Sequence, residues 1–185
     1  SSMAQQPSYS DRLQQLSHGR WFVPLLSGIG SGGTRSVELR QSLGLSASML
    51  RRSLEQMQNQ GWIMPNPGHG HPLRPEWVTT EKGATLIASC QAIMAERRAL
   101  GLPAGGVGRW HLPLITQLID QEKRFGELQN ALSPVTPRAL SLALKRSMAL
   151  GQVERRLEAD FPPMAIYGIT DKARPLAEAA STLTG

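Results

Sequence analysis

Cysteine is almost missing from this chain of 185 residues: Cys90 stands alone, so no internal disulfide can form. Aromatic residues make up only 5% of the chain, and no apolar run reaches the roughly 18 residues that a membrane-spanning helix needs. No secretory signal is recognisable ahead of the first expected domain. These absences predict a cytoplasmic protein that does not associate with membranes.

Motifs that carry catalytic chemistry are also missing. The chain contains no GxSxG, no glycine-rich phosphate loop and no HExxH, so we expect neither enzyme activity nor a cofactor. The segment Gly68-His69-Gly70-His71 offers two imidazoles, with Glu76 nearby as a further ligand type. A metal site needs more ligands than this segment supplies, so we interpret it as a loop tip and expect no metal.

Basic residues are in excess. Lys and Arg number 20 against 14 Asp and Glu, which gives a formal net charge of +6 and a pI near 10.2. The excess is spread over both halves of the chain and favours a polyanionic partner such as a nucleic acid.

An internal repeat is the strongest signal in the sequence. The segment Gly19–Leu26 (GRWFVPLL) recurs 89 residues later as Gly108–Ile115 (GRWHLPLI). An inserted residue near Pro134 then shifts the offset to 90, and matches continue in the same order. This pattern predicts a duplicated domain. We expect an N-terminal extension or helix at residues 1–18, copy one at 19–100, a linker at 101–107 and copy two at 108–185.

Each copy is expected to contain three helices, a β-hairpin and a closing helix. Apolar residues spaced by three and four, from Trp21 to Ile29 and from Trp110 to Leu118, predict the buried face of a first helix. A short second helix is expected at 36–43 and at 125–132. The third begins after the N-caps Ser46 and Thr136 and ends at Gly61 and Gly151. Its predicted buried seam is Leu50, Leu54 and Met57 in copy one, and Leu140, Leu144 and Met148 in copy two.

The predicted hairpins follow these third helices. Their arms show alternation with period two and lie at 62–64 and 77–79 in copy one, and at 152–157 and 165–169 in copy two. Thr80 and Thr170 are the expected caps of the closing helices. Two helices around a tight turn and then a hairpin define a winged helix-turn-helix. The fold class is therefore α+β, mainly helical, with two such domains in tandem.

The exposed face of each third helix is the candidate DNA-reading surface. A recognition helix reads the major groove through its first turns, and Arg suits a guanine edge. Wing residues reach phosphate or the minor groove, where His69, His71 and Arg74 of the first wing are also candidates. The residues that we expect to contact DNA are the following: Ser46, Ser48, Arg51, Arg52, Thr136, Arg138, Ser141, Lys145, Arg146, Arg155 and Arg156.

Copy two resembles the HxlR-type regulators of the winged-helix class. The resemblance rests on Arg124-Phe-Gly-Glu-Leu128, Thr136-Pro-Arg-Ala-Leu-Ser141 and Leu150-Gly-Gln-Val-Glu-Arg155, with Thr170-Asp-Lys172 beyond the wing. Copy one is a more distant relative and has Ala47-Ser48 in place of the Pro-Arg pair. The resemblance implies small bacterial DNA-binding regulators, which are usually homodimers of a single domain.

Two domains in one chain then imply a covalent pseudo-dimer. In the resembled family the closing helices make the dimer contact, and apolar residues from Leu86 to Met94 and from Leu176 to Leu183 suit that role here. We expect a monomer with internal pseudo-twofold symmetry, or a homodimer. Oxidant-sensing members use a cysteine near the N-terminus, and this sequence has none there. Cys90 is expected to be a small buried core residue.

Two functions remain open from the sequence. The first is a sequence-specific regulator that binds double-stranded DNA, most simply a repressor that acts by occlusion, with recognition helices near 46–60 and 136–149. The second is a tandem winged-helix adaptor that binds a protein partner, because fold alone does not dictate function.

Overall fold

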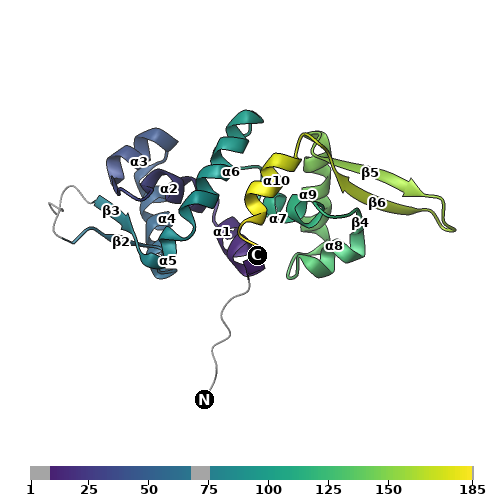
Figure 1. The fold of residues 1–185 in the computed structure, drawn as a ribbon, viewed down its shortest axis with the longest axis horizontal. Helices are drawn as coiled ribbons and strands as arrows, with labels where there is room; N and C mark the ends of the chain where they lie inside the picture. Colours follow the sequence, from purple (N-terminus) through teal and green to yellow (C-terminus); the bar gives the residue numbers. More distant parts are fainter. Residues whose placement is uncertain (1–8, 68–75, 185) are drawn as a thin grey trace, which may run out of the picture. The chain divides into compact units, whose positions relative to one another are not determined.

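The computed structural model describes residues 9–67 and 76–184 of the chain, with side chains from residue 12 onward. These residues form two compact units, labelled by element in Figure 1. The copy-one unit is Gly19–Gly105. The copy-two unit combines residues from Gly106 onward with the N-terminal helix α1, Tyr9–His18. Within the described ranges, no helix is long and apolar enough to cross a bilayer.

Each unit contains a winged helix-turn-helix. The copy-one elements are α2 (Phe22–Ile29), β1 (Thr34–Arg35), α3 (Ser36–Leu43), α4 (Ala47–Asn59), β2 (Ile63–Pro65), β3 (Glu76–Thr79), α5 (Glu81–Ala84) and α6 (Ile87–Ala99). The copy-two elements are α7 (His111–Gln117), β4 (Lys123–Arg124), α8 (Phe125–Ala131), α9 (Pro137–Ala149), β5 (Val153–Glu158), β6 (Met164–Ile169) and α10 (Arg174–Ser181). Apart from α5, the two series run in the same order, which confirms the prediction of tandem winged-helix domains.

A third strand joins each hairpin and was not predicted. The sheet orders are β1-β3-β2 and β4-β6-β5, both antiparallel. The strand β4 places Lys123 opposite Tyr167 and Arg124 opposite Ile166. A strand of two residues shows no period of its own in the sequence, because it exists only through pairing with the hairpin. Its function is to fix the start of α3 or α8 against the wing.

Both ends of each recognition helix are capped. At the N-terminus, the Ser46 hydroxyl accepts a hydrogen bond from the Met49 amide at 3.2 Å, and Thr136 accepts one from Ala139 at 3.1 Å. Pro137 follows Thr136 at the start of α9, where a missing N–H costs least. These caps agree with the predicted helix starts.

At the C-terminus, Gly61 and Gly151 adopt φ angles of +77° and +70°, which favour glycine. The residue after each glycine donates its amide back into the last helical turn. The Trp62 amide reaches the Met57 carbonyl at 3.1 Å, and the Gln152 amide reaches the Ser147 carbonyl at 2.9 Å. This Schellman arrangement turns the chain directly from the recognition helix into the wing.

A threonine after the hairpin ties the wing to the end of the recognition helix in both units. In copy one the Thr80 hydroxyl donates to the Gly61 carbonyl at 2.5 Å, and the Thr80 amide donates to Trp62 at 3.0 Å. In copy two the Thr170 hydroxyl donates to Gly151 at 2.8 Å, and its amide donates to Gln152 at 3.1 Å. We call this pair of bonds the helix–wing clasp.

A lysine two residues after each threonine adds to the clasp. Lys82 donates to the Gln60 carbonyl at 2.8 Å, and Lys172 donates to the Leu150 carbonyl at 3.4 Å. Both carbonyls lie at the C-terminal cap of a recognition helix, where the helix dipole favours a cation.

The cores of the two units differ at one matched pair of positions. In copy one the Phe22 ring packs edge-on against Trp62, with ring centres 5.3 Å apart and planes at 78°. The matching residues in copy two are His111 and Gln152, which are both buried and hydrogen-bonded to each other. An aromatic pair in one copy is therefore replaced by a polar pair in the other.

The structure corrects several details of the expected helices. Trp21 and Trp110 are half-buried caps ahead of α2 and α7, rather than members of the buried face. An arginine lies over each ring, Arg20 at 4.9 Å and Arg109 at 4.6 Å from its centre. Phe22 and His111, which follow the two tryptophans in the chain, are the buried residues instead.

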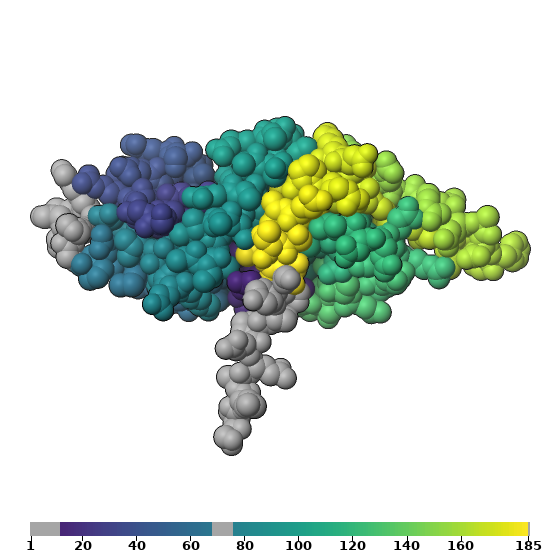
Figure 2. Space-filling model, viewed as in Figure 1, coloured from purple at the N-terminus to yellow at the C-terminus, as the bar shows by residue number. Residues whose placement is uncertain are grey.

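On α9, Leu140 and Leu144 are buried as predicted, but the third seam position is Ser147, and Met148 is half-buried. The strand burial also lacks the expected alternation, because most of β5 is exposed on both faces. The hairpin β5–β6 extends as a narrow arm beyond the helices of its unit (Figures 1 and 2), so few of its side chains meet the core.

The closing segments also differ from the prediction. Thr80 caps the short helix α5, accepting from the Gly83 amide at 3.1 Å, and the longer helix α6 starts later at Ile87. Thr170 precedes a turn instead, and α10 starts at Arg174. A Cβ on Gly83 would overlap the Trp62 carbonyl, so this tight approach is open to glycine. The matching residue in copy two is Ala173, which explains why a turn replaces α5 there.

The N-terminal helix α1 packs against α7 in the copy-two unit. Leu13 and Leu16 of α1 are buried. The segment at residues 1–18, expected only as an extension or helix, thus contributes its described part to the core of a domain that starts about ninety residues later in the chain.

We predict that Gly83→Ala destabilises the protein by about 1–3 kcal/mol, because the added methyl group overlaps the Trp62 carbonyl and forces a backbone shift. Urea unfolding followed by circular dichroism measures the change. Gly126→Ala is the matched control, because Gly126 is an exposed residue of α8 with no atom near its added Cβ. There we expect a gain of about 0.5–1 kcal/mol. Equal stability of Gly83→Ala and the wild type would contradict the packing argument.

Candidate nucleic-acid interface

The recognition helix α9 of copy two presents cations to solvent. Arg138 lies one residue after the helix start and is exposed, Ser141 is half-buried, and Lys145 is exposed one turn later. Spacings of three and four residues place these side chains on one side of the helix. The sequence of α9 includes three cations and no acid, so this face is uniformly positive.

Arg146 also lies on α9 and is exposed, but its guanidinium has a local partner. Its Nη1 donates to the Val107 carbonyl at 2.9 Å. A Cβ on Gly108 would come within 2.8 Å of the same nitrogen, so the glycine provides room for the arginine. Arg146 therefore fixes the end of the linker to its recognition helix, a contact between residues far apart in sequence that its helical position did not indicate.

The recognition helix α4 of copy one is less positive. Arg51 and Arg52 are exposed near its middle, and Glu55 lies one turn beyond Arg51. Ser46 and Ser48 are exposed at its start, with their hydroxyl oxygens 3.3 Å apart. Copy one thus places hydroxyls in the first turn of its recognition helix, where copy two places Arg138.

The wing of copy two separates its two arginines. Arg155 is opposite Tyr167 in the sheet and Arg156 is opposite Ile166, so adjacent arginines point to opposite faces. Arg156 pairs with Glu122 at 2.6 Å and lies 3.7 Å from Glu158. The hydrogen bond that Arg156 donates to Glu122 and the negative charges of Glu122 and Glu158 raise the pKa of Arg156 above its ordinary value.

Arg124 continues the same charged row, at 3.4 Å from Glu158 and 3.9 Å from Asp160. Among the described residues, Arg155 has no ion-pair partner and is exposed. Of the two wing arginines predicted to contact DNA, Arg155 is thus the one whose charge is not already paired.

The tip of the copy-one wing, with His69, His71 and Arg74, lies outside the described residues. Within residues 9–67 and 76–184, no group of three or more His, Cys, Asp or Glu gathers in a geometry that would hold a metal ion.

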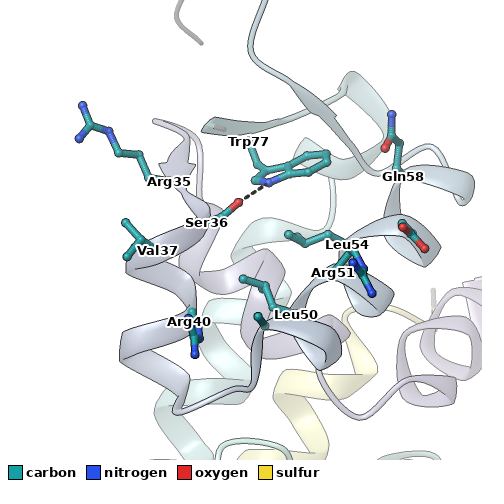
Figure 3. A pocket seen from close by; sticks show the side chains of 11 residues that line it. Arg35, Ser36, Val37, Arg40, Leu50, Arg51, Leu54, Gln58 and Trp77 are labelled. Atoms are coloured by element: carbon teal, nitrogen blue, oxygen red, sulfur yellow. Dashed lines mark hydrogen bonds between the residues drawn. The ribbon is translucent and has the colours of Figure 1, made fainter. Parts of the chain in front are cut away.

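A groove of about 990 Å³ opens beside α4 in copy one. It is bounded by the start of α3, by one side of α4 and by Trp77 of β3 (Figure 3). The Trp77 indole donates to the Ser36 hydroxyl at 2.8 Å across its upper end. Copy two has Phe125 and Tyr167 at these two positions, so a phenyl ring takes the place of the hydroxyl there.

The buried pair Cys90 and Arg97 lies on α6, away from the recognition helix. Burial raises the pKa of the Cys90 thiol to about 12, against a smaller opposite effect of the Arg97 charge. Burial also lowers the pKa of Arg97 to about 10. At neutral pH the thiol is therefore protonated and the guanidinium remains charged.

Three helices with a tight turn, a capped recognition helix and a three-stranded wing define a winged helix-turn-helix protein, here with two such domains. The family comparison agrees. The HxlR-like helix-turn-helix family matches residues 16–99 and again residues 107–185. The chain belongs to this family and contains two copies of its domain.

Curated relatives share one copy's length of sequence. An uncharacterized HTH-type transcriptional regulator of Halalkalibacterium halodurans is 39% identical over 70 residues, which are 37% of this chain and 62% of the relative. The uncharacterized HTH-type transcriptional regulator YybR of Bacillus subtilis is 35% identical over 69 residues, covering 37% of this chain and 55% of YybR. The chain thus spans under two thirds of each of these relatives.

Solved structures of transcriptional regulators also match about half of this chain. A transcriptional regulator of the MarR family from Enterococcus faecalis is 30% identical, with a TM-score of 0.40, covering 48% of this chain and 76% of the other. The reduced form of the regulator YodB from Bacillus subtilis is 23% identical, with a TM-score of 0.38, covering 57% and 88%.

Local sequence rules identified the caps and the exposed recognition-helix residues, and the structure brings each set together on one helix. They missed the roles of Arg146 and Arg97, because both depend on backbone carbonyls of the linker. The only sequence signal for these contacts is the glycine and proline content of residues 100–108, which shows a linker but not its partners.

We predict that Cys90 is unreactive in the folded protein, because it is fully buried and its pKa of about 12 leaves almost no thiolate at neutral pH. Titration with Ellman's reagent at neutral pH should detect no thiol before unfolding and one per chain in guanidinium chloride. Rapid release of one equivalent from the native protein would contradict this prediction.

Proposed function

We propose that this protein is a transcriptional regulator that binds specific sequences in double-stranded DNA, with α9 as its principal recognition helix. The supporting observation is the acid-free face of α9, where Arg138 and Lys145 are exposed and the helix start is capped by Thr136. A guanidinium in the first turn of a helix in the major groove can bond both acceptors of a guanine. Membership of the HxlR-like helix-turn-helix family supports the same function.

The wing supplies the second contact. Arg155 is exposed on β5 with no ion pair among the described residues, which suits a phosphate or the minor groove. The remaining predicted contacts of copy two are Thr136, Ser141 and Arg146, with Arg156 reaching DNA only by leaving Glu122. In copy one the contacts are Ser46, Ser48, Arg51 and Arg52.

Repression by occlusion is the simplest mode of action, because a protein that covers two successive major grooves blocks other proteins from the same face of DNA. This mode requires both recognition helices to engage one site, as in a pseudo-twofold monomer. The matched element order gives each unit a recognition helix, which this mode needs. A function in binding chromosomal DNA implies a location in the cytoplasm.

One observation favours the alternative, a tandem winged-helix adaptor that binds a protein. The end of the copy-two wing exposes Leu157, Phe161 and Met164, and Phe161 is fully exposed. Leu157 and Met164 lie on opposite faces of the hairpin and Phe161 lies in the loop between its arms, so the end of the wing is apolar on more than one side and suits contact with a protein. The same DNA-binding experiment separates the two functions, because an adaptor does not depend on Arg138 and Lys145 for its partner.

We predict that the purified chain selects a motif from random duplex DNA, and that Arg138→Ala lowers affinity for that motif by about 1–3 kcal/mol, or roughly 5- to 150-fold. Lys145→Ala should weaken binding to all sequences alike and reduce the salt dependence by about one counterion. Fluorescence anisotropy at about 50 and 200 mM salt measures both effects.

Arg109→Ala is the matched control, because it removes an exposed arginine that lies over Trp110 rather than on α9. Its affinity should stay within about twofold of the wild type. No enriched motif, or full affinity in the Arg138→Ala, Lys145→Ala double variant, would exclude α9 as a recognition helix and favour the adaptor.

We further predict that the motif contains two half-sites with centres roughly 34 Å apart, one turn of DNA. Arg51→Ala with Arg52→Ala should then weaken protection of one half-site and leave the other unchanged in a hydroxyl-radical footprint. The half-sites should differ in sequence, because copy one offers Ser48 where copy two offers Arg138. A single protected half-site in the wild type would show that copy one does not read DNA.

A further inference from the structure

A second cavity lies inside the copy-one unit, on the other side of α3 from the recognition helix. Its volume is about 320 Å³, which is in the range of small-molecule sites. Its walls come from α2, α3, α6 and the first residues of the linker. The lining is Pro24, Ser27, Gly28, Leu39, Ser42 and Leu43 on one side, and Met94, Arg97, Arg98, Leu102 and Ala104 on the other.

Arg97 is the unusual member of this lining. Its exposed fraction is only 6%, yet it is a charged residue. One terminal nitrogen donates to the Ala104 carbonyl at 3.0 Å, while Nε is buried and has no hydrogen-bond partner among the described residues. A buried guanidinium with unused donors is costly, and buried charges are normally paired.

No acid in the described part of the chain neutralises Arg97. The one charge-bearing group that acts on it is Cys90, and that thiol is protonated at neutral pH because burial raises its pKa to about 12. The second cation of the lining, Arg98, is exposed at the rim. The cavity is therefore positive at its inner wall, with no negative charge to offset it.

The backbone holds Arg97 in place. The α6 helix ends at Ala99, and the Leu102 amide donates back to the Arg97 carbonyl at 2.9 Å. The side chain of Arg97 then bonds Ala104 two residues farther on. Both bonds fold the linker over the end of α6, so the guanidinium is fixed at the cavity wall rather than free to turn into solvent.

The remaining lining is mostly apolar, with hydroxyls from Ser27 and Ser42. A guanidinium fork matches the two oxygens of a carboxylate, and the apolar walls favour a ligand with a hydrocarbon or aromatic body over a strongly hydrated inorganic anion. We propose that this cavity binds a small organic carboxylate, with Arg97 as its anion-binding residue and the apolar walls around its body.

Copy two is built differently at the matching positions. Gln117 replaces Gly28, and both its backbone carbonyl and its side-chain oxygen accept hydrogen bonds from Lys123, at 2.7 and 3.0 Å. Thr116 replaces Ser27. Gly28 leaves space in copy one that a glutamine side chain would occupy, so we assign one site to each chain, in copy one.

The test uses the full chain without DNA, so that its result does not depend on the proposed function. Benzoate is the probe, titrated by isothermal calorimetry, with benzyl alcohol as the neutral ligand of similar shape. We expect saturable binding of one benzoate per chain and binding of benzyl alcohol at least tenfold weaker. Arg97→Met should lower benzoate affinity at least tenfold, while Arg97→Lys should retain part of it.

Arg97→Met should fold, because a side chain of similar length replaces an unpaired buried charge, and its circular dichroism spectrum checks this. Ser27→Leu keeps Arg97 but fills the cavity from α2, and it should also abolish binding. The proposal is overturned by any of three results. These are no saturable binding below about 10 mM benzoate, equal affinity in folded Arg97→Met, or binding that survives Ser27→Leu.

Discussion

The helix–wing clasp is the contact on which the geometry of each domain depends. A threonine that follows the hairpin bonds the two carbonyls just after the C-cap of the recognition helix, and a lysine two residues later bonds the carbonyl of the C-cap residue itself. Because the recognition helix and the far arm of the wing are tied at one point, neither can tilt without the other. The helix and the wing are thus joined through hydrogen bonds to backbone carbonyls, which do not require particular core side chains.

The clasp also explains how the two copies can diverge inside. Phe22 and Trp62 form an aromatic pair in copy one, and the buried pair His111 and Gln152 takes these positions in copy two. Ser36 becomes Phe125 beside the wing tryptophan or tyrosine. The first exchange alters the core and the second a half-buried site beside the wing, and a domain tolerates both when its backbone frame is fixed elsewhere. The frame is shared, and the side chains packed beside it differ between the copies.

Local chemistry made much of this fold predictable. The bounds of α3 and the caps Ser46 and Thr136 follow from capping preference and from the glycines that end the helices. The short strands β1 and β4, the buried Ser147 in place of Met148, and the closing turn after Thr170 were not predictable in this way. Each of these features depends on contacts with residues distant in sequence. The pattern of residues along one segment does not show such contacts. For the candidate interface, exposure of Arg138 and Lys145 was predictable, whereas the attachment of Arg146 to Val107 was not.

The position of α1 changes how the chain is connected. Since α1 packs on α7, the copy-two unit is discontinuous, and copy one is inserted between its first helix and the rest. The chain passes between the units twice, at His18 to Gly19 and at Gly105 to Gly106. A single cut in the linker would leave copy one covalently joined to α1 alone, and α1 reaches copy two only through its packing on α7. In topological terms the copy-two unit is a host domain, and the copy-one unit is a guest inserted between its first helix and its remainder.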